Sequence, residues 1–261
     1  MEHPHLAVRE ELRAPIAAAP PATVRLPDHR SRRRASLTAG VALALMAALA
    51  GFAVFGVIAP LITDADAITT AQNIAASPSL FRLGIACLIV VVLLDVIVAV
   101  SLFTVFSGTD PMIAGLAAAF RIAYAAVYLV AIAQLVLAVR WVDDPDLALR
   151  AIDTYSTIWD VALILFAAHL LLIGLLAWRS GFMPKIFGVL LALSGLGYLV
   201  DGFGSVLQGD VFGVGRFTFV GEVALIFWLL IRGRRSDFRP NDDRGQDRDR
   251  GALASAGGAT L

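Results

Sequence analysis

The chain has 261 residues, of which 59% are hydrophobic and only 16% are charged. Soluble domains contain about 45–50% apolar and about 25% charged residues, so this composition excludes an ordinary soluble protein. The net charge is zero, which leaves no overall field to attract nucleic acid, and we expect no nucleic-acid partner. More than half of the charged residues lie in residues 1–35 and 233–261. The sequence therefore predicts an apolar body between two polar tails.

Six segments of the body are long and apolar enough to cross a membrane, because about 20 apolar residues span a hydrocarbon core of roughly 30 Å. None has the single polar stripe of a soluble helix. We predict an all-α, polytopic transmembrane helix bundle over residues 36–233, with a disordered basic tail at 1–35 and a disordered tail at 234–261. The six predicted spanning helices are Leu37–Ile62, Leu83–Phe106, Ile113–Val139, Thr157–Trp178, Ile186–Leu207 and Val214–Ile231.

The first span has a second interpretation, a cleaved signal peptide, because Ala65–Ala67 resembles a cleavage site. Its length and the long charged region before it favour a retained anchor. The segment that follows, Asp64–Leu80, predicts a short surface helix that ends before the second span.

The remaining connections predict hairpins. Ser107–Pro111 is a tight turn in which Asp110 can cap the next helix. Trp141–Ser156 predicts a longer, acidic connection between the third and fourth spans. Arg179–Lys185 is a second tight turn, with Gly ending one helix and Pro opening the next.

The basic residues near the spans set the expected orientation, because Lys and Arg favour the cytoplasmic side. With six spans, ten of them fall on one side and four on the other, so we expect both termini to be cytoplasmic. We expect a multi-pass protein of the bacterial plasma (inner) membrane, with the lipid bilayer as its partner. Arg32, Arg33 and Arg34 either contact anionic lipid or serve only as topology determinants.

Four ionisable residues on four different spans lie near the same depth. Counted at about 1.5 Å per residue from the cytoplasmic ends, Asp95, Arg121, His169 and Glu222 lie roughly 14–16 Å deep. A charge near the bilayer centre costs several kcal/mol on insertion scales, so each of these groups calls for a partner or a use. The sequence therefore predicts a polar cluster near the middle of the membrane.

Asp95 and Arg121 are the expected ion pair, because a tight turn makes their helices antiparallel neighbours. Glu222 is interpreted either as a second carboxylate for Arg121 or as a hydrogen-bond partner for His169. Both a functional pocket and a purely structural clamp between helices fit this pattern. Arg121 at the same level argues against a metal site, and the sequence indicates no cofactor.

A second, outer group of ionisable residues is expected toward the opposite side, in which Asp201 and Arg216 lie at equal depth. The members of this group are Arg82, Asp160, Asp201 and Arg216. The fifth span is rich in glycine, and its Gly188 and Ala192 have the spacing that lets helix backbones approach closely. Close packing and a hinge lining a cavity are both compatible with these glycines.

Several short blocks of sequence recur in a fixed order along the body: Asn73–Ile74, Phe81–Gly84 with Asp95, and His169 followed by the turn Ser180–Pro184. In their order and spacing these blocks resemble a bacterial membrane family called domain of unknown function 4386. The resemblance covers about residues 36–233 and implies a membrane location. It implies no activity, cofactor or substrate.

Three hypotheses for function remain open at this point. The first is a membrane protein whose midplane cluster binds, transports or senses a small solute or protons. The second is a structural or partner-binding protein in which the charges only clamp helices together. An enzyme is less favoured, because no nucleophile–base pair and no His-Glu-x-x-His pattern occurs in the chain.

Overall fold

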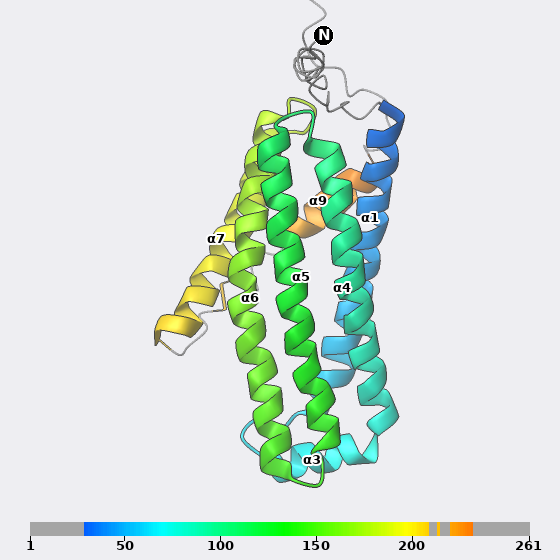
Figure 1. The fold of residues 1–261 in the computed structure, drawn as a ribbon, viewed down its shortest axis with the longest axis vertical. Coiled ribbons are helices and arrows are strands. Elements are labelled where there is room, and N and C mark those ends of the chain that lie inside the picture. The colour runs from blue at the N-terminus through cyan, green and yellow to red at the C-terminus, as the bar shows by residue number, and fades with distance from the viewer. Residues whose placement is uncertain (1–28, 209–212, 215–219, 232–261) are drawn as a thin grey trace, which may run out of the picture.

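The computed structural model describes residues 29–208, 213–214 and 220–231, and every regular element in these ranges is a helix. Figure 1 shows α1, α4, α5 and α6 running along the long axis of the molecule, while α7 leans away from α6 at its lower end and α9 crosses the bundle obliquely. The elements are α1 (His29–Gly51), the π-helix η3 (Phe52–Ile58), α2 (Ala59–Leu61), α3 (Ala67–Ala76), α4 (Pro78–Phe106), α5 (Pro111–Arg140), α6 (Pro145–Arg179), α7 (Lys185–Gln208) and α9 (Val220–Ile231).

Five helical stretches of the described chain are long and apolar enough to cross a membrane. They are Arg30–Leu61, Pro78–Phe106, Pro111–Arg140, Pro145–Arg179 and Lys185–Leu207. The 12 residues of α9 are apolar but cover only about 18 Å at 1.5 Å per residue, less than a hydrocarbon core of roughly 30 Å. Residues 215–219 of the predicted sixth span lie outside the described ranges. The described residues thus contain five full-length spans, compared with six expected.

The connection expected at Trp141–Ser156 is helical over most of its length, because α6 already begins at Pro145. Asp144 caps this helix by accepting a hydrogen bond from the backbone N–H of Leu147 at 3.2 Å. Ala148, Ala151, Ile152 and Tyr155 are buried and recur with helical spacing, so they form one apolar face. The acidic residues made the segment look like a loop, but Asp146 and Asp153 lie on the exposed side of α6, and Asp143 and Asp144 directly precede it.

The first helix also begins before its predicted span. Residues 29–35, assigned from sequence to the N-terminal tail, form the first two turns of α1. Its Ser36 hydroxyl is buried and donates to the backbone carbonyl of Leu229 in α9, at 3.3 Å. The rest of the predicted tails, residues 1–28 and 234–261, lies outside the described ranges.

A short helix lies between the first two spans, as the sequence predicted. Asp66 caps α3, accepting from the Thr69 hydroxyl at 2.6 Å and from the Thr69 N–H at 2.9 Å. These hydrogen bonds to the exposed carboxylate lower the pKa of Asp66, the side-chain bond contributing most. Asp110 caps α5 in the same way, accepting from the N–H groups of Met112 and Ile113.

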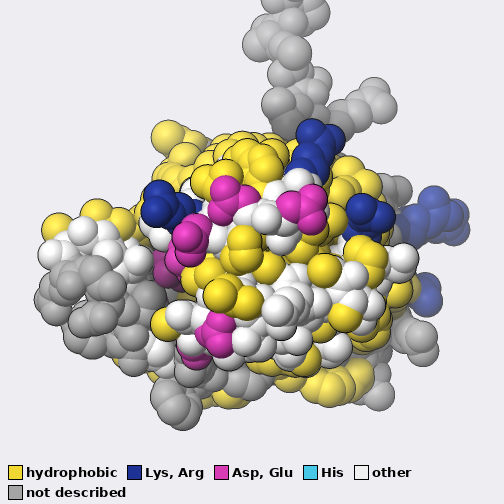
Figure 2. Space-filling view, turned by 90° about the horizontal axis from the view of Figure 1, so that it is seen from below, with side chains coloured by type: hydrophobic (Ala, Val, Ile, Leu, Met, Phe, Trp, Pro, Cys, Tyr) yellow, Lys and Arg dark blue, Asp and Glu magenta, His cyan; other side chains and the backbone are white. Residues whose placement is uncertain are grey.

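The two ends of the bundle differ in charge. The start of α1 and the α4–α5 and α6–α7 turns lie at one end (top of Figure 1), called here the basic end after Arg30, Arg32, Arg33, Arg34, Arg179 and Lys185. The opposite, acidic end carries α3 and the α5–α6 turn, with Asp64, Asp66, Asp143, Asp144 and Asp146. Figure 2 looks onto the acidic end and shows magenta Asp and Glu side chains across this face, with dark-blue Lys and Arg groups nearer its rim.

Glycine allows α6 and α7 to touch through their backbones. A Cβ atom added at Gly188 would lie 2.7 Å from the carbonyl oxygen of Gly174 and 2.9 Å from the backbone nitrogen of Trp178. One added at Gly195 would lie 2.9 Å from the carbonyl oxygen of Ala167. Because backbone atoms cannot move aside as a side chain can, these contacts fit the close-packing interpretation of the glycine-rich fifth span.

Replacing Gly188 by Ala should lower the free energy of unfolding by about 1–3 kcal/mol, because the new methyl group forces two packed backbones apart. Gly51→Ala is the matched control, since no atom lies within 4 Å of the position its Cβ would take. This control should be neutral or stabilising by up to about 1 kcal/mol, the usual gain of Ala over Gly in a helix. Unfolding of both variants in detergent micelles measures the difference, and equal values would contradict the backbone contact.

Candidate functional site

A buried ion pair joins α4 to α5 inside the bundle. Nη2 of Arg121 lies 2.7 Å from Oδ1 of Asp95, and the two side chains are 4% and 1% exposed. The α4–α5 hairpin makes the helices antiparallel neighbours, which places the two residues opposite each other. The contact is a close ion pair between two side chains that are both almost fully buried.

His169 of α6 holds the same arginine from another side. Its Nε2 lies 3.2 Å from Nη1 of Arg121, and its Nδ1 lies 2.8 Å from the carbonyl oxygen of Ala117 on α5. A guanidinium only donates and a carbonyl only accepts, so Nε2 must accept and Nδ1–H must donate. His169 is therefore the neutral tautomer in this arrangement, with both ring nitrogens used in bonds to α5.

Aromatic rings complete the surroundings of Arg121. Its Cζ atom lies 5.3 Å from the centre of the Phe166 ring, within the range of a cation–π contact. The same ring lies beside His169, with centroids 5.9 Å apart, and meets the edge of Tyr198 at 5.7 Å. Arg121 therefore has a carboxylate, an imidazole and an aromatic face as neighbours, from α4 and α6.

Glu222 joins the cluster indirectly, and neither of its expected partners is its hydrogen-bond partner. The Tyr198 hydroxyl of α7 donates to Oε1 of Glu222 at 2.8 Å. Because α9 contacts α7 and α1, its carboxylate meets α7 before it can reach Arg121 or His169. Glu222 is thus linked to Arg121 only through the rings of Tyr198 and Phe166. The other three expected residues, Asp95, Arg121 and His169, are in direct contact.

Three buried polar atoms of the ion pair have no hydrogen-bond partner among the described residues: Oδ1 and Oδ2 of Asp95 and Nε of Arg121. Of these, Oδ1 has the ion-pair contact with Arg121, whereas Oδ2 and Nε have neither. A buried polar atom without a partner costs about 1–3 kcal/mol, and more when it is charged. The cluster is thus held firmly on one side and retains unused bonding capacity on the other, which is the combination a binding site needs.

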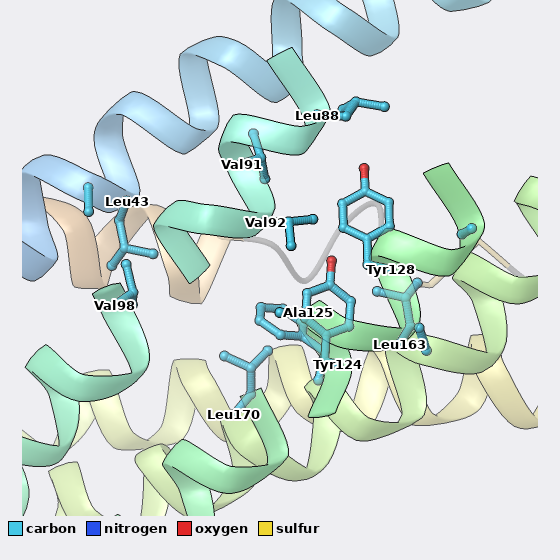
Figure 3. Packing of buried hydrophobic residues seen from close by; sticks show 14 of the residues in the cluster. Leu43, Leu88, Val91, Val92, Val98, Tyr124, Ala125, Tyr128, Leu163 and Leu170 are labelled. Atoms are coloured by element: carbon cyan, nitrogen blue, oxygen red, sulfur yellow. The ribbon is translucent and has the colours of Figure 1, made fainter. Parts of the chain in front are cut away.

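A row of aromatic side chains extends from the cluster toward the acidic end. Tyr124 lies 4.9 Å from Phe166 and 5.7 Å from Tyr128, which is followed by Tyr155 of α6 at 6.5 Å. Figure 3 shows the Tyr124 and Tyr128 rings with their hydroxyls pointing toward the same side. This row places phenol hydroxyls between the ion pair and one end of the bundle.

Sequence reasoning missed these aromatic neighbours, although a signal was present. Arg121, Tyr124 and Tyr128 follow one another at i, i+3 and i+7, so they lie on one face of α5. Phe166 and His169 are likewise one turn apart on α6. Extending the face that carries each ionisable residue would have identified them.

The described members of the expected outer group divide between two helix pairs: Asp160 and Asp201 lie on α6 and α7, and Arg82 lies on α4 beside α5. Asp160 of α6 accepts from the Ser205 hydroxyl of α7 at 3.5 Å, and Asp201 accepts from the N–H of Val214 at 3.0 Å. Arg82 instead lines a cavity between α4 and α5. Arg216 lies outside the described residues, so its expected pairing with Asp201 stays a prediction.

The structure and the comparisons together identify the kind of protein. Several long apolar helices that enclose a cluster of ionisable side chains are those of an integral, multi-pass membrane protein. The chain belongs to the family described as domain of unknown function (DUF4386), whose sequence model matches residues 38–233. An uncharacterized protein of Archaeoglobus fulgidus is 32% identical over 152 residues, which are 58% of this chain and 85% of the archaeal protein. No solved structure matches the chain.

Removing either partner of the buried pair should destabilise the protein strongly. Removing both partners should cost less than the sum of the two single losses. Asp95→Asn and Arg121→Met should each cost about 3–5 kcal/mol, because each leaves the other partner without its counterpart in a low-dielectric interior. The double variant should cost clearly less than the two single losses combined, because no uncompensated charge remains.

Arg150→Met is the control, since Arg150 is an exposed arginine of α6 and should contribute less than about 0.5 kcal/mol. The wild-type protein and the four variants are compared by denaturant unfolding in detergent micelles. Strict additivity of the two single losses would mean that Asp95 and Arg121 are not coupled.

Proposed function

We propose that this protein binds a proton or a small polar solute at the cluster of Asp95, Arg121 and His169, in the middle of the bilayer. The observation that carries the proposal is the ion pair itself. The two side chains are at most 4% exposed, and both carboxylate oxygens of Asp95 and Nε of Arg121 have no hydrogen-bond partner among the described residues. Ionisable groups inside a membrane are costly and commonly mark ion or substrate pathways.

The chemistry available at the pair is simple. A proton on Oδ2 of Asp95 neutralises the carboxylate and weakens its attraction for Arg121, which frees a guanidinium held by His169 alone. A small zwitterion offers the same groups in complementary form, an ammonium for Asp95 and a carboxylate for Arg121. The row of Tyr124, Tyr128 and Tyr155 supports access from the acidic end, because each phenol is both a donor and an acceptor.

The orientation we propose has the basic end in the cytoplasm of a bacterial cell, with six spans and both termini on that side. The uneven charge of the two ends supports it, since Lys and Arg favour the cytoplasmic side. Arg33 and Arg34 are exposed on α1, and Arg32 is half-buried. We propose that these residues contact anionic headgroups of the plasma membrane.

Proton movement is tested with the full-length protein in liposomes that contain a trapped pH-sensitive dye, after a step in external pH with the membrane potential clamped. The wild-type protein should dissipate the gradient faster than protein-free liposomes do, and Asp95→Asn should reduce the rate to that of protein-free liposomes. Asp160→Asn is the matched control, because it changes a half-buried carboxylate of α6 outside the cluster, and it should leave the rate unchanged.

Solute binding is tested with glycine as a zwitterionic probe, by its effect on the thermal unfolding midpoint in detergent. A rise in the midpoint that disappears in Asp95→Asn and in Arg121→Gln, but not in Asp160→Asn, supports a solute site. Absence of both the proton flux and the glycine shift would contradict the proposal.

A second candidate function is a structural one, in which the charges only hold helices together. The observation that favours it is that His169 uses both ring nitrogens for bonds to α5, which is what a clamp between α5 and α6 requires. A clamp needs opposite charges on α4 and α5 but is indifferent to which helix carries which.

The exchange variant Asp95→Arg/Arg121→Asp separates these two functions. If the cluster is a clamp alone, the exchange should recover most of the stability lost in either single variant, and no variant should alter proton flux or glycine binding. If the cluster is a binding site, the exchange can recover folding but not flux or binding, because His169 and Phe166 then surround a carboxylate in place of a guanidinium. Unfolding midpoints and flux measured on the same preparations decide between the outcomes.

A further inference from the structure

Two arginines line a cavity that is separate from the buried cluster. Arg82 of α4 and Arg140 of α5 flank a cavity of about 270 Å³ near the acidic end, and Ile85, Val136 and Val139 complete its wall. Arg82 is the fifth residue of α4, and Arg140 is the last residue of α5. Both arginines are exposed, so the cavity opens outward between the two helices.

Neither guanidinium forms an ion pair within the part of the chain that the structure describes. This is notable at an end where aspartates outnumber arginines, since a nearby carboxylate would be the usual partner. Two like charges that share one cavity repel each other, and an anion bound between them offsets this repulsion by attracting both. The arrangement therefore favours an anion supplied from outside the described chain.

The depth and lining of the cavity indicate what kind of anion fits. The arginines lie where two membrane-spanning helices end, which is the level of the lipid headgroups. Apolar side chains lie about one turn closer to the bilayer on both helices: Ile85 is three residues into α4 from Arg82, and Val136 is four residues before Arg140. Two guanidinium groups at the headgroup level, with apolar side chains one turn deeper in the bilayer, suit a lipid that has a phosphate in its headgroup and hydrocarbon chains beneath it.

We infer that Arg82 and Arg140 form a phosphate-binding site between α4 and α5, suited to the headgroup of a phospholipid in the leaflet at the acidic end. The planar fork of each arginine can bind phosphate oxygens in a bidentate manner, as a lysine cannot. A single arginine that merely extends toward the interface would explain one of these residues. A bound phosphate explains why two arginines line one cavity with no counter-charge from the described residues.

The test uses the purified full-length protein in detergent, titrated with dioleoyl-phosphatidylglycerol while the thermal unfolding midpoint is followed. Dioleoylglycerol, which has the same chains and no phosphate, is the lipid control. Inorganic phosphate, compared with chloride at equal ionic strength, tests a soluble source of the same group. The variants are Arg82→Gln/Arg140→Gln, and Arg150→Gln as an exposed arginine outside the cavity.

Phosphatidylglycerol should raise the midpoint of the wild-type protein and of Arg150→Gln at the same lipid concentration. The double variant should need at least about tenfold more lipid, because it has lost both groups that donate charge-assisted hydrogen bonds to the phosphate. A shift with lipid but not with inorganic phosphate assigns the site to a headgroup. A shift with inorganic phosphate that the double variant loses supports the phosphate site and assigns it to a soluble anion.

Two results would overturn the inference: an unchanged titration in the double variant, or an equal effect of dioleoylglycerol. If the double variant does not fold, Arg82→Gln and Arg140→Gln are measured singly, and each should weaken the phosphatidylglycerol effect. Both singles matching Arg150→Gln would equally refute the site.

Discussion

The arrangement of this bundle depends on one requirement, that the guanidinium of Arg121 be surrounded by partners inside a medium without water. A guanidinium has five N–H donors and cannot lose its charge, so the neighbouring helices must supply acceptors. Asp95 supplies the counter-charge from α4, His169 an uncharged nitrogen from α6, and Phe166 an aromatic face. Because these partners come from two helices on either side of α5, the rotation of all three helices about their axes is constrained at this level.

The contact between α6 and α7 extends this cluster to the last described helix. Gly195 lets the α7 backbone approach Ala167, and Tyr198 follows one turn later, where its ring meets Phe166 and its hydroxyl binds Glu222. A bulkier residue at Gly195 would move Tyr198 away from Phe166. Backbone packing by glycine and the polar network are therefore parts of one arrangement, and each limits how far the other can change.

Sequence reasoning found what depends on composition and local spacing, and missed what depends on neighbouring helices. The apolar lengths of the second and third spans and the cap at Asp110 follow from local rules, as does the opposition of Asp95 and Arg121 across a hairpin. The sequence prediction missed the first turns of α6, from Pro145 to Ser156, because it relied on the polarity of this segment and not on its helical periodicity. The link from Glu222 to Tyr198 depends on how α9 crosses α7, and no pattern within either helix specifies that crossing.

The arginines of the membrane-spanning helices show how burial decides where a counter-charge comes from. Arg121 is almost fully buried, where no solvent or headgroup can reach it, so the fold itself must provide Asp95. Arg82 and Arg140 lie at helix ends, where leaving a charge without a protein partner costs little because headgroups and water are close. An arginine therefore indicates different things at the two depths. A buried arginine with protein partners indicates an internal polar network, whereas two exposed arginines that share a cavity, with no counter-charge among the described residues, indicate a bound anion.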